Sequence, residues 1–236
     1  MGPPYFSAMM PGAWLNEGGQ SMAGAAIEQL LAMHPAAAGQ RAVAERGGQS
    51  LPAMLSDLAA LVSAGVSDTA LLAGGLHVVP EFLGNRAPFA DPEARAVIAG
   101  LGMDQGADSL VALYIAGLCG IGYGLRQIIE AQSVAGAPIE RVVISGGAGR
   151  RDLVRQLLAD AIGRPVLATE AAEPVLLGAA ILGSVAGGLF GDVNAAMKRM
   201  SRIARTYEPA TGDIAALHVR RYRAFTQLQR VAREIR

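Results

Sequence analysis

The segment from Arg141 to Gly187 constrains the possible folds most strongly. It predicts a strand over Arg141–Ser145, a helix over Asp152–Ile162, a second strand over Val166–Thr169 and a second helix over Val175–Gly187. In the first of these helices one face carries the apolar residues Leu153, Leu157, Leu158 and Ile162. Strands that alternate with helices are typical of α/β proteins, and we therefore expect a sheet that is at least partly parallel.

The chain has 236 residues, which suffice for one substantial core, and we expect a single domain over residues 1–236. Further helices are predicted over Ser21–Met33, Leu51–Ala64 and Asp108–Ala135. The predicted strands are "AWLNEGG" (13–19) and "GGLHVVPEF" (74–82). We expect residues 34–54 to cross the surface with weak helical content before the second of these helices, and residues 83–101 to form a loop.

Composition favours neither nucleic acid nor a membrane as a partner. Basic and acidic residues balance at 20 each. The tail from Lys198 onward has ten basic and three acidic residues, but an apolar stripe predicts a docked helix with a solvated cationic face: Ile214, Leu217, Phe225, Leu228 and Ile235. The uncharged runs Ser109–Leu125 and Pro174–Gly191 fall short of the roughly 20 apolar residues of a membrane span, and we expect both to form glycine-rich helices buried in the core.

Cysteine and histidine usage narrows the setting further. The single cysteine, Cys119, excludes an internal disulfide and suits a reducing compartment. The three histidines lack ligand spacing, so no metal site is predicted. Without a recognisable secretory signal in these residues, we expect a cytoplasmic location.

The glycine turn "SGGAGRRD" (145–152) leaves two interpretations open. It is neither a Walker loop nor GxGxxG. Backbone N–H groups at Gly146, Gly147 and the following helix N-terminus suit a phosphate or nucleotide. Alternatively, glycine is needed there only for a positive φ. Asp152 is expected as an N-cap or a first-turn residue.

Longer stretches resemble the FGGY carbohydrate kinases. "GGAGRRDLVRQLLADAIGRPVLATEAAEPVLLGAAILGSVAGG" is similar to that family's C-terminal signature region, and "FLGNRAPFADPEARAVIAGL" to its "GERTPxxDPxARGxxxGL" loop. "GPPYFSAMMPGAWLNEGGQS" and "MKRMSRIARTYEP" resemble the D-ribulokinase branch. The match covers nearly the whole chain in the family's order.

The resemblance implies an α/β, actin-like ATPase domain of ribonuclease-H-like topology. It would be the C-terminal, nucleotide-side half of a two-domain sugar kinase, without its first strands. ATP and Mg²⁺ are the implied cofactors, with the sugar in the cleft between the domains. The positions that match nucleotide-lining positions of the family are Gly24, Glu28, Gly146, Gly147 and Arg151. Glu17 matches a glutamate that reaches a sugar hydroxyl; its alternative is a surface carboxylate.

The family's catalytic aspartate and its phosphate-gripping "GT(S)" hairpin have no counterpart in this sequence, and the implied partner is therefore a missing N-terminal kinase half. We expect part of an ATP-dependent pentulose kinase, with D-ribulose the favoured substrate, that is inactive alone. The alternative is a catalytically incompetent module that binds nucleotide or a partner chain. A dinucleotide-binding oxidoreductase module is disfavoured because GxGxxG is absent. An unpaired sheet edge also predicts self-association, in the form of aggregation or a homo-oligomer.

Overall fold

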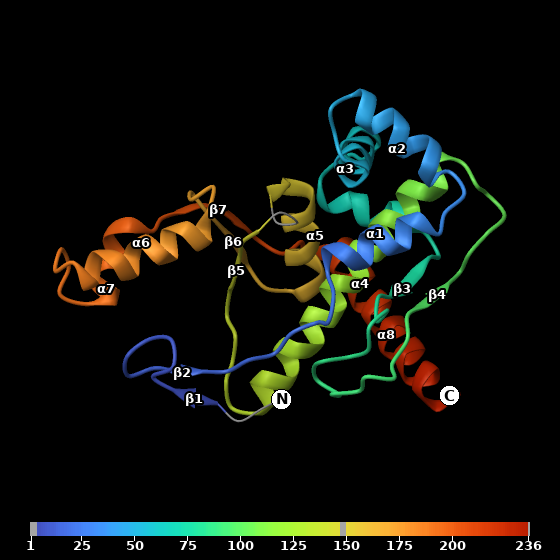
Figure 1. Ribbon diagram of the computed structural model, residues 1–236. Helices are drawn as coiled ribbons and strands as arrows, with labels where there is room; N and C mark the ends of the chain where they lie inside the picture. The colour runs from blue at the N-terminus through green and yellow to red at the C-terminus, as the bar shows by residue number, and fades with distance from the viewer. Residues whose placement is uncertain (1–3, 147–149, 236) are drawn as a thin grey trace.

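A long buried helix, α4 (Ala107–Val134), organises the molecule (Figure 1). The computed structural model describes residues 4–146 and 150–235. The helices around α4 are α1 (Gly24–Ala32), α3 (Leu51–Val62), the 3₁₀ helix η1 (Ser67–Ala73), α5 (Asp152–Ile162) and α8 (Gly212–Glu234). The core is therefore assembled on one helix instead of on a broad sheet.

Glycines allow neighbouring elements to approach α4 closely. A Cβ atom added to Gly120 would lie 2.3 Å from the carbonyl oxygen of Val78, and one added to Gly122 would lie 2.5 Å from Cβ of Ala161. Both distances are below the contact distance of carbon with its neighbours. The prediction that the glycine-rich run Ser109–Leu125 forms a buried core helix is confirmed. By length and composition α4 could span a membrane, but 67% of its most apolar window is buried inside the protein.

Strands form three small sheets. β1 (Tyr5–Phe6) pairs with β2 (Trp14–Leu15), and β3 (His77–Val79) pairs with β4 (Val97–Ala99), both antiparallel. The third sheet has the order β5-β6-β7 and consists of β5 (Val142–Ile144), β6 (Val166–Thr169) and β7 (Ile203–Tyr207). β5 and β6 run parallel and β7 is antiparallel. Within the described residues β5 has a strand on one side only, so its other edge is open.

The predicted strand–helix–strand unit is confirmed, with β5 one residue shorter at each end and with α5 and β6 at the predicted bounds. The apolar face of α5 is buried, and Gly163 ends the helix in the left-handed conformation at φ 63°. This unit fixes where the start of α5 lies relative to α4, on which α5 packs.

Three expectations are wrong. Residues 34–54 contain a full helix, α2 (Ala37–Arg46), and the expected loop at 83–101 contains β4. The run 174–191 forms the helix α6 (Pro174–Ala186), as predicted, but it is not a core helix, because Ile181 is its one residue that is buried. α6 packs mainly on α7 (Val193–Met200), and the two project from the body of the molecule (Figure 1).

The C-terminal helix α8 docks as expected through part of its apolar stripe. Phe225 is buried, and Leu217 and Leu228 pack against the core. Ile235 is 80% exposed and does not belong to the docked face.

Candidate nucleotide site

A cavity of about 420 Å³ lies between α1, α3, α4 and the start of α5. Three of the residues predicted to line a nucleotide border it, although they are far apart in the sequence: Gly24, Glu28 and Arg151. The other lining residues are Ile27, Ser50, Pro52, Ala53, Tyr114, Leu118, Arg150 and Val154. The cavity thus combines an apolar wall with a charged rim.

α1 supplies one wall. Gly24 is the first residue of α1, and a Cβ atom there would meet no protein atom within 4 Å. Glu28 follows one helical turn later and shares the face of Gly24. Its Oε2 accepts a hydrogen bond of 2.8 Å from the guanidinium of Arg41 on α2, so the carboxylate is already paired.

The opposite wall comes from the start of α3 and the middle of α4. Ser50 caps α3 and accepts a 3.3 Å hydrogen bond from the backbone N–H of Ala53. Tyr114 shares a 2.7 Å hydrogen bond with the hydroxyl of Ser56. Burial raises the pKa of Tyr114, although the hydrogen bond to Ser56 opposes the rise. This wall is therefore uncharged.

Two arginines stand at the rim. Arg150 donates a 2.8 Å hydrogen bond to Glu173, and Arg151 forms an ion pair with Asp57 of α3. The side chains of all four residues are at least 38% exposed. Exposed pairs of this kind contribute little to stability, so the arginines can exchange partners at small cost.

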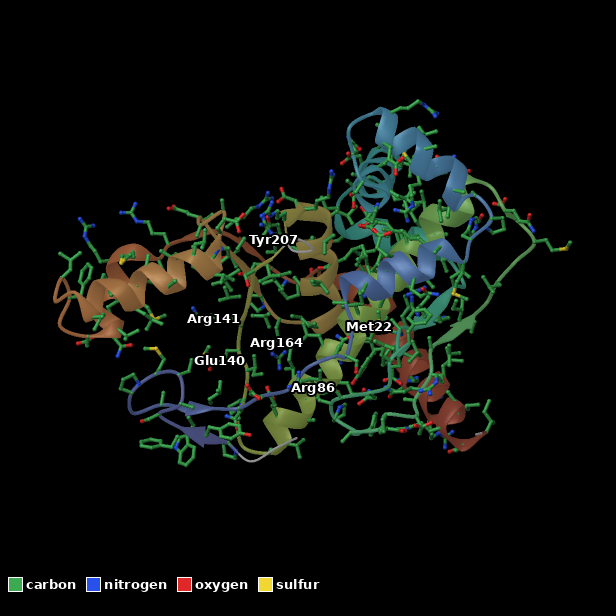
Figure 2. All side chains as sticks on the ribbon, viewed as in Figure 1. Met22, Arg86, Glu140, Arg141, Arg164 and Tyr207 are labelled. Carbon is green, nitrogen blue, oxygen red and sulfur yellow. The ribbon has the colours of Figure 1, made fainter. Side chains whose placement is uncertain are left out.

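The N-terminus of α5 also reaches this rim. Arg151 is the N-cap residue, and its side chain makes no capping hydrogen bond. Asp152 is a first-turn residue and not the N-cap. Its carboxylate accepts hydrogen bonds of 2.5 Å from the hydroxyl of Tyr207 (labelled in Figure 2) and of 2.7 Å from Arg205, both on β7. The start of α5 carries the partial positive charge of a helix N-terminus, and the carboxylate of Asp152 in the first turn offsets part of it.

The other predicted site residues lie elsewhere. Gly146 has φ 90°, which agrees with the interpretation that glycine is needed there for a positive φ. It does not border the cavity. Gly147 lies outside the described residues. Glu17 borders a separate cavity of about 430 Å³ together with Asn16, Gly18, Arg86 and Arg141. Arg86 and Arg141 lie in the central part of the view in Figure 2.

The sequence did not identify most residues of the apolar wall. Tyr114 and Leu118 fall on a uniformly apolar helix, and no pattern marks the face that borders a cavity. Ser50 carried a usable signal, because serine followed two residues later by proline is typical of a helix start.

Among the described residues there is no group of three or more His, Cys, Asp or Glu side chains that could hold a metal ion. Glu28, which lines the 420 Å³ cavity, and Asp57 and Glu173 beside its two rim arginines are each paired with an arginine.

Comparisons with known proteins add to this geometry. The chain is 38% identical over 225 residues to an FGGY carbohydrate kinase domain-containing protein of Homo sapiens, covering 95% of this chain and 40% of that protein. It is 35% identical over 186 residues to a D-ribulokinase of Saccharomyces cerevisiae, covering 78% of this chain and 26% of that protein. The chain therefore spans less than half the length of these relatives.

A solved structure of xylulose kinase from Rhodospirillum rubrum superimposes with a TM-score of 0.71 at 25% identity, covering 96% of this chain and 41% of that one. The model of the FGGY family of carbohydrate kinases, C-terminal domain, matches residues 2–187. The described part of this chain has the mixed helix and sheet of the actin-like ATPase fold that these sugar kinases share. The chain therefore belongs to the FGGY family of carbohydrate kinases, which are phosphotransferases, and corresponds to their C-terminal domain.

Proposed function

We propose that this chain is the ATP-binding part of a carbohydrate kinase that phosphorylates a pentulose, with D-ribulose as the favoured substrate. The observation that carries the proposal is the convergence of Gly24, Glu28 and Arg151 on one cavity. Ile27, Leu118 and Val154 offer apolar contacts for a purine and ribose, and the open space over Gly24 lets them approach the backbone.

The phosphates would lie toward the N-terminus of α5. The partial positive charge of a helix start and the guanidinium groups of Arg150 and Arg151 favour an anion there. Both arginines are held by exposed carboxylates, Glu173 and Asp57, that a phosphate can displace. Binding would then open the ion pairs at the rim.

Mg²⁺ would accompany the nucleotide in our proposal, but the described residues do not fit a resident metal site. Glu28, the one carboxylate among the described lining residues, is engaged by Arg41, and no group of three or more His, Cys, Asp or Glu side chains that could hold a metal occurs among residues 4–146 and 150–235. Mg²⁺ commonly retains several waters and binds through substrate phosphates. We therefore assign no residue of this chain to the metal.

The sugar would lie on the side of Glu17. Its cavity shares no lining residue with the nucleotide cavity, and Arg86 and Arg141 there supply hydrogen-bond donors beside the carboxylate. The relatives named above include both a D-ribulokinase and a xylulose kinase, so D-ribulose rests on the loop sequences around Glu17. We further propose that the general base and the phosphate-gripping hairpin come from a kinase half outside these 236 residues.

The second candidate function is nucleotide binding without catalysis. It is favoured by the lining of the cavity: Glu28 is the one carboxylate among the described lining residues, and its pairing with Arg41 leaves it unsuited to accept a proton from a sugar hydroxyl. The two candidates share the nucleotide cavity and differ in whether a sugar is phosphorylated once the other half is supplied.

Calorimetric titration of the chain with MgATP tests the shared part. Gly24→Val places a side chain in open space, so the fold should survive while the cavity loses room, and we expect affinity to fall at least tenfold. Gly39→Val is the matched control, because Gly39 is also helical, also borders open space and lies on α2 away from the cavity. Equal affinity in the wild type and Gly24→Val would refute the assignment. ATP-dependent phosphorylation of D-ribulose after fusion to the missing half would favour the kinase over the binding module.

A further inference from the structure

A third cavity, of about 490 Å³, lies between α4, α5 and α8. It shares no lining residue with the nucleotide cavity. With the cavity that contains Glu17 it shares one, Ile129. The proposed kinase function makes no use of it. Arg164, labelled in Figure 2, is one of its lining residues.

Two buried polar side chains line this cavity from different helices. Asp160 of α5 is 5% exposed and His218 of α8 is 1% exposed. Burial of a carboxylate or an imidazole is costly unless each polar atom finds a partner. Such a pair within a core therefore calls for an explanation.

Each side chain has one satisfied atom and one orphan atom. Oδ1 of Asp160 accepts hydrogen bonds of 2.7 Å from the backbone N–H of Ala210 and 2.9 Å from the amide of Gln156, whereas Oδ2 has no partner. Nδ1 of His218 lies 2.9 Å from the hydroxyl of Tyr123, whereas Nε2 has no partner. Leaving a buried donor or acceptor unpaired costs about 1–3 kcal/mol.

The two orphan atoms complement a hydroxyl group. A hydroxyl donates one hydrogen bond and accepts others. When the hydroxyl of Tyr123 donates to Nδ1 of His218, the proton of the neutral ring lies on Nε2, which then donates. Oδ2 of an ionised Asp160 can only accept. One hydroxyl between the two atoms would satisfy both.

The rest of the lining indicates a neutral ligand. The two cations, Arg126 and Arg164, offset the two anions, Glu130 and Asp160, and Arg126 is paired with Glu130 at 2.8 Å. Ser133 adds a further hydroxyl. The remaining wall is apolar and suits the C–H faces of a sugar ring or polyol chain: Ile129, Val134, Ile162, Ala215 and Val219.

We propose that this cavity binds a neutral polyhydroxylated molecule, a free sugar or a sugar alcohol, through one hydroxyl that donates to Oδ2 of Asp160 and accepts from Nε2 of His218. The site is separate from the sugar position proposed beside Glu17. It would act on the enzyme as an effector site, because α4 borders both this cavity and the nucleotide cavity.

The test is titration of the chain with ribitol and with D-ribulose, in which the NMR chemical shifts of backbone amides report binding. Ala215→Met fills the cavity from α8, and Ala216→Met places the same side chain on the next, exposed position of the helix as the matched control. We expect saturable shifts around α5 and α8, an affinity at least tenfold lower in Ala215→Met and an unchanged affinity in Ala216→Met. Asp160→Asn keeps the shape of the side chain, and it should weaken binding without filling the cavity.

Two further variants separate this site from the others. Glu17→Ala and Gly24→Val should leave ribitol binding unchanged, whereas MgATP binding should survive in Ala215→Met. The absence of saturable binding for both probes, which would indicate that water alone satisfies Asp160 and His218, would overturn the proposal. Saturable shifts around α5 and α8 that are lost in Glu17→Ala or retained in Ala215→Met would overturn it as well.

Discussion

Substitution of Gly122 by alanine should push α5 away from α4 and lower the free energy of unfolding. The new Cβ atom would lie 2.5 Å from Cβ of Ala161, about 1 Å or more inside the optimal carbon–carbon distance. Overpacking of this kind costs about 1–3 kcal/mol. Alanine also favours a helix over glycine by up to about 1 kcal/mol, so the net loss of stability is smaller than the steric cost.

A matched control isolates the steric contribution. Gly39→Ala in α2 meets no atom within 4 Å and should gain only the helix preference. We expect the free energies of unfolding of the two variants, measured by urea denaturation with circular dichroism, to differ by about 1–3 kcal/mol. Ala161→Gly removes the opposing methyl group, so the double mutant should recover more stability than the single changes predict. Equal stability of Gly122→Ala and Gly39→Ala, or additive effects in the cycle, would show that the contact is not constraining.

Burial lowers the pKa of His218 from 6.5 to about 4, and Asp160 opposes the shift. Between these pH values the unfolded chain binds a proton that the folded chain does not bind. The free energy of unfolding should therefore fall by about 3 kcal/mol as pH drops from 6.5 to 4, and it should fall less steeply in His218→Gln. Leu176 and Leu182 on α6 are 67% and 59% exposed, so we expect the chain to self-associate through α6. The double variant Leu176→Glu/Leu182→Glu should sediment as a smaller species than the wild type, and identical sedimentation would exclude α6 from the contact. In a kinase restored by fusion, Glu17→Ala should lower kcat/KM for D-ribulose about ten- to a hundredfold while KM for ATP barely changes, and an effect on ATP alone would contradict the placement of Glu17.

The sequence predicted those elements whose pattern is local. β5, α5 and β6 combine short β-branched strands with one apolar helix face, and their bounds agree with the prediction within one residue. α4 was predictable as a long buried helix because its length, its apolar run and its glycines all indicated close packing. By contrast, α2 has a weak apolar face, and β4 has three residues inside a proline-containing loop.

Burial of α6 was predicted wrongly because composition does not show what covers a helix. The run from Pro174 to Ala186 is as apolar as a core helix, yet the described residues supply no broad surface to pack on it apart from α7. The candidate site shows the same limit. Gly24, Glu28 and Arg151 came from the family resemblance, whereas Tyr114 and Leu118 depend on which face of α4 meets α1 and α3, and this is a tertiary property.

The projecting pair of helices has a simple topological consequence. β6 ends at Thr169 and β7 begins at Ile203, these two residues are partners in the sheet, and the N–H of Glu170 donates to the carbonyl of Arg202 at 3.1 Å. The chain thus leaves and rejoins the sheet at one point, and residues 170–202 are an enlarged hairpin loop. Because the entropy of closing a loop grows slowly with its length, such an excursion can be shortened or lengthened at little cost to the body that carries it. The tip between α6 and α7 is accordingly a suitable place to graft a reporter or affinity tag at a distance from the cavities around α4 (Figure 1).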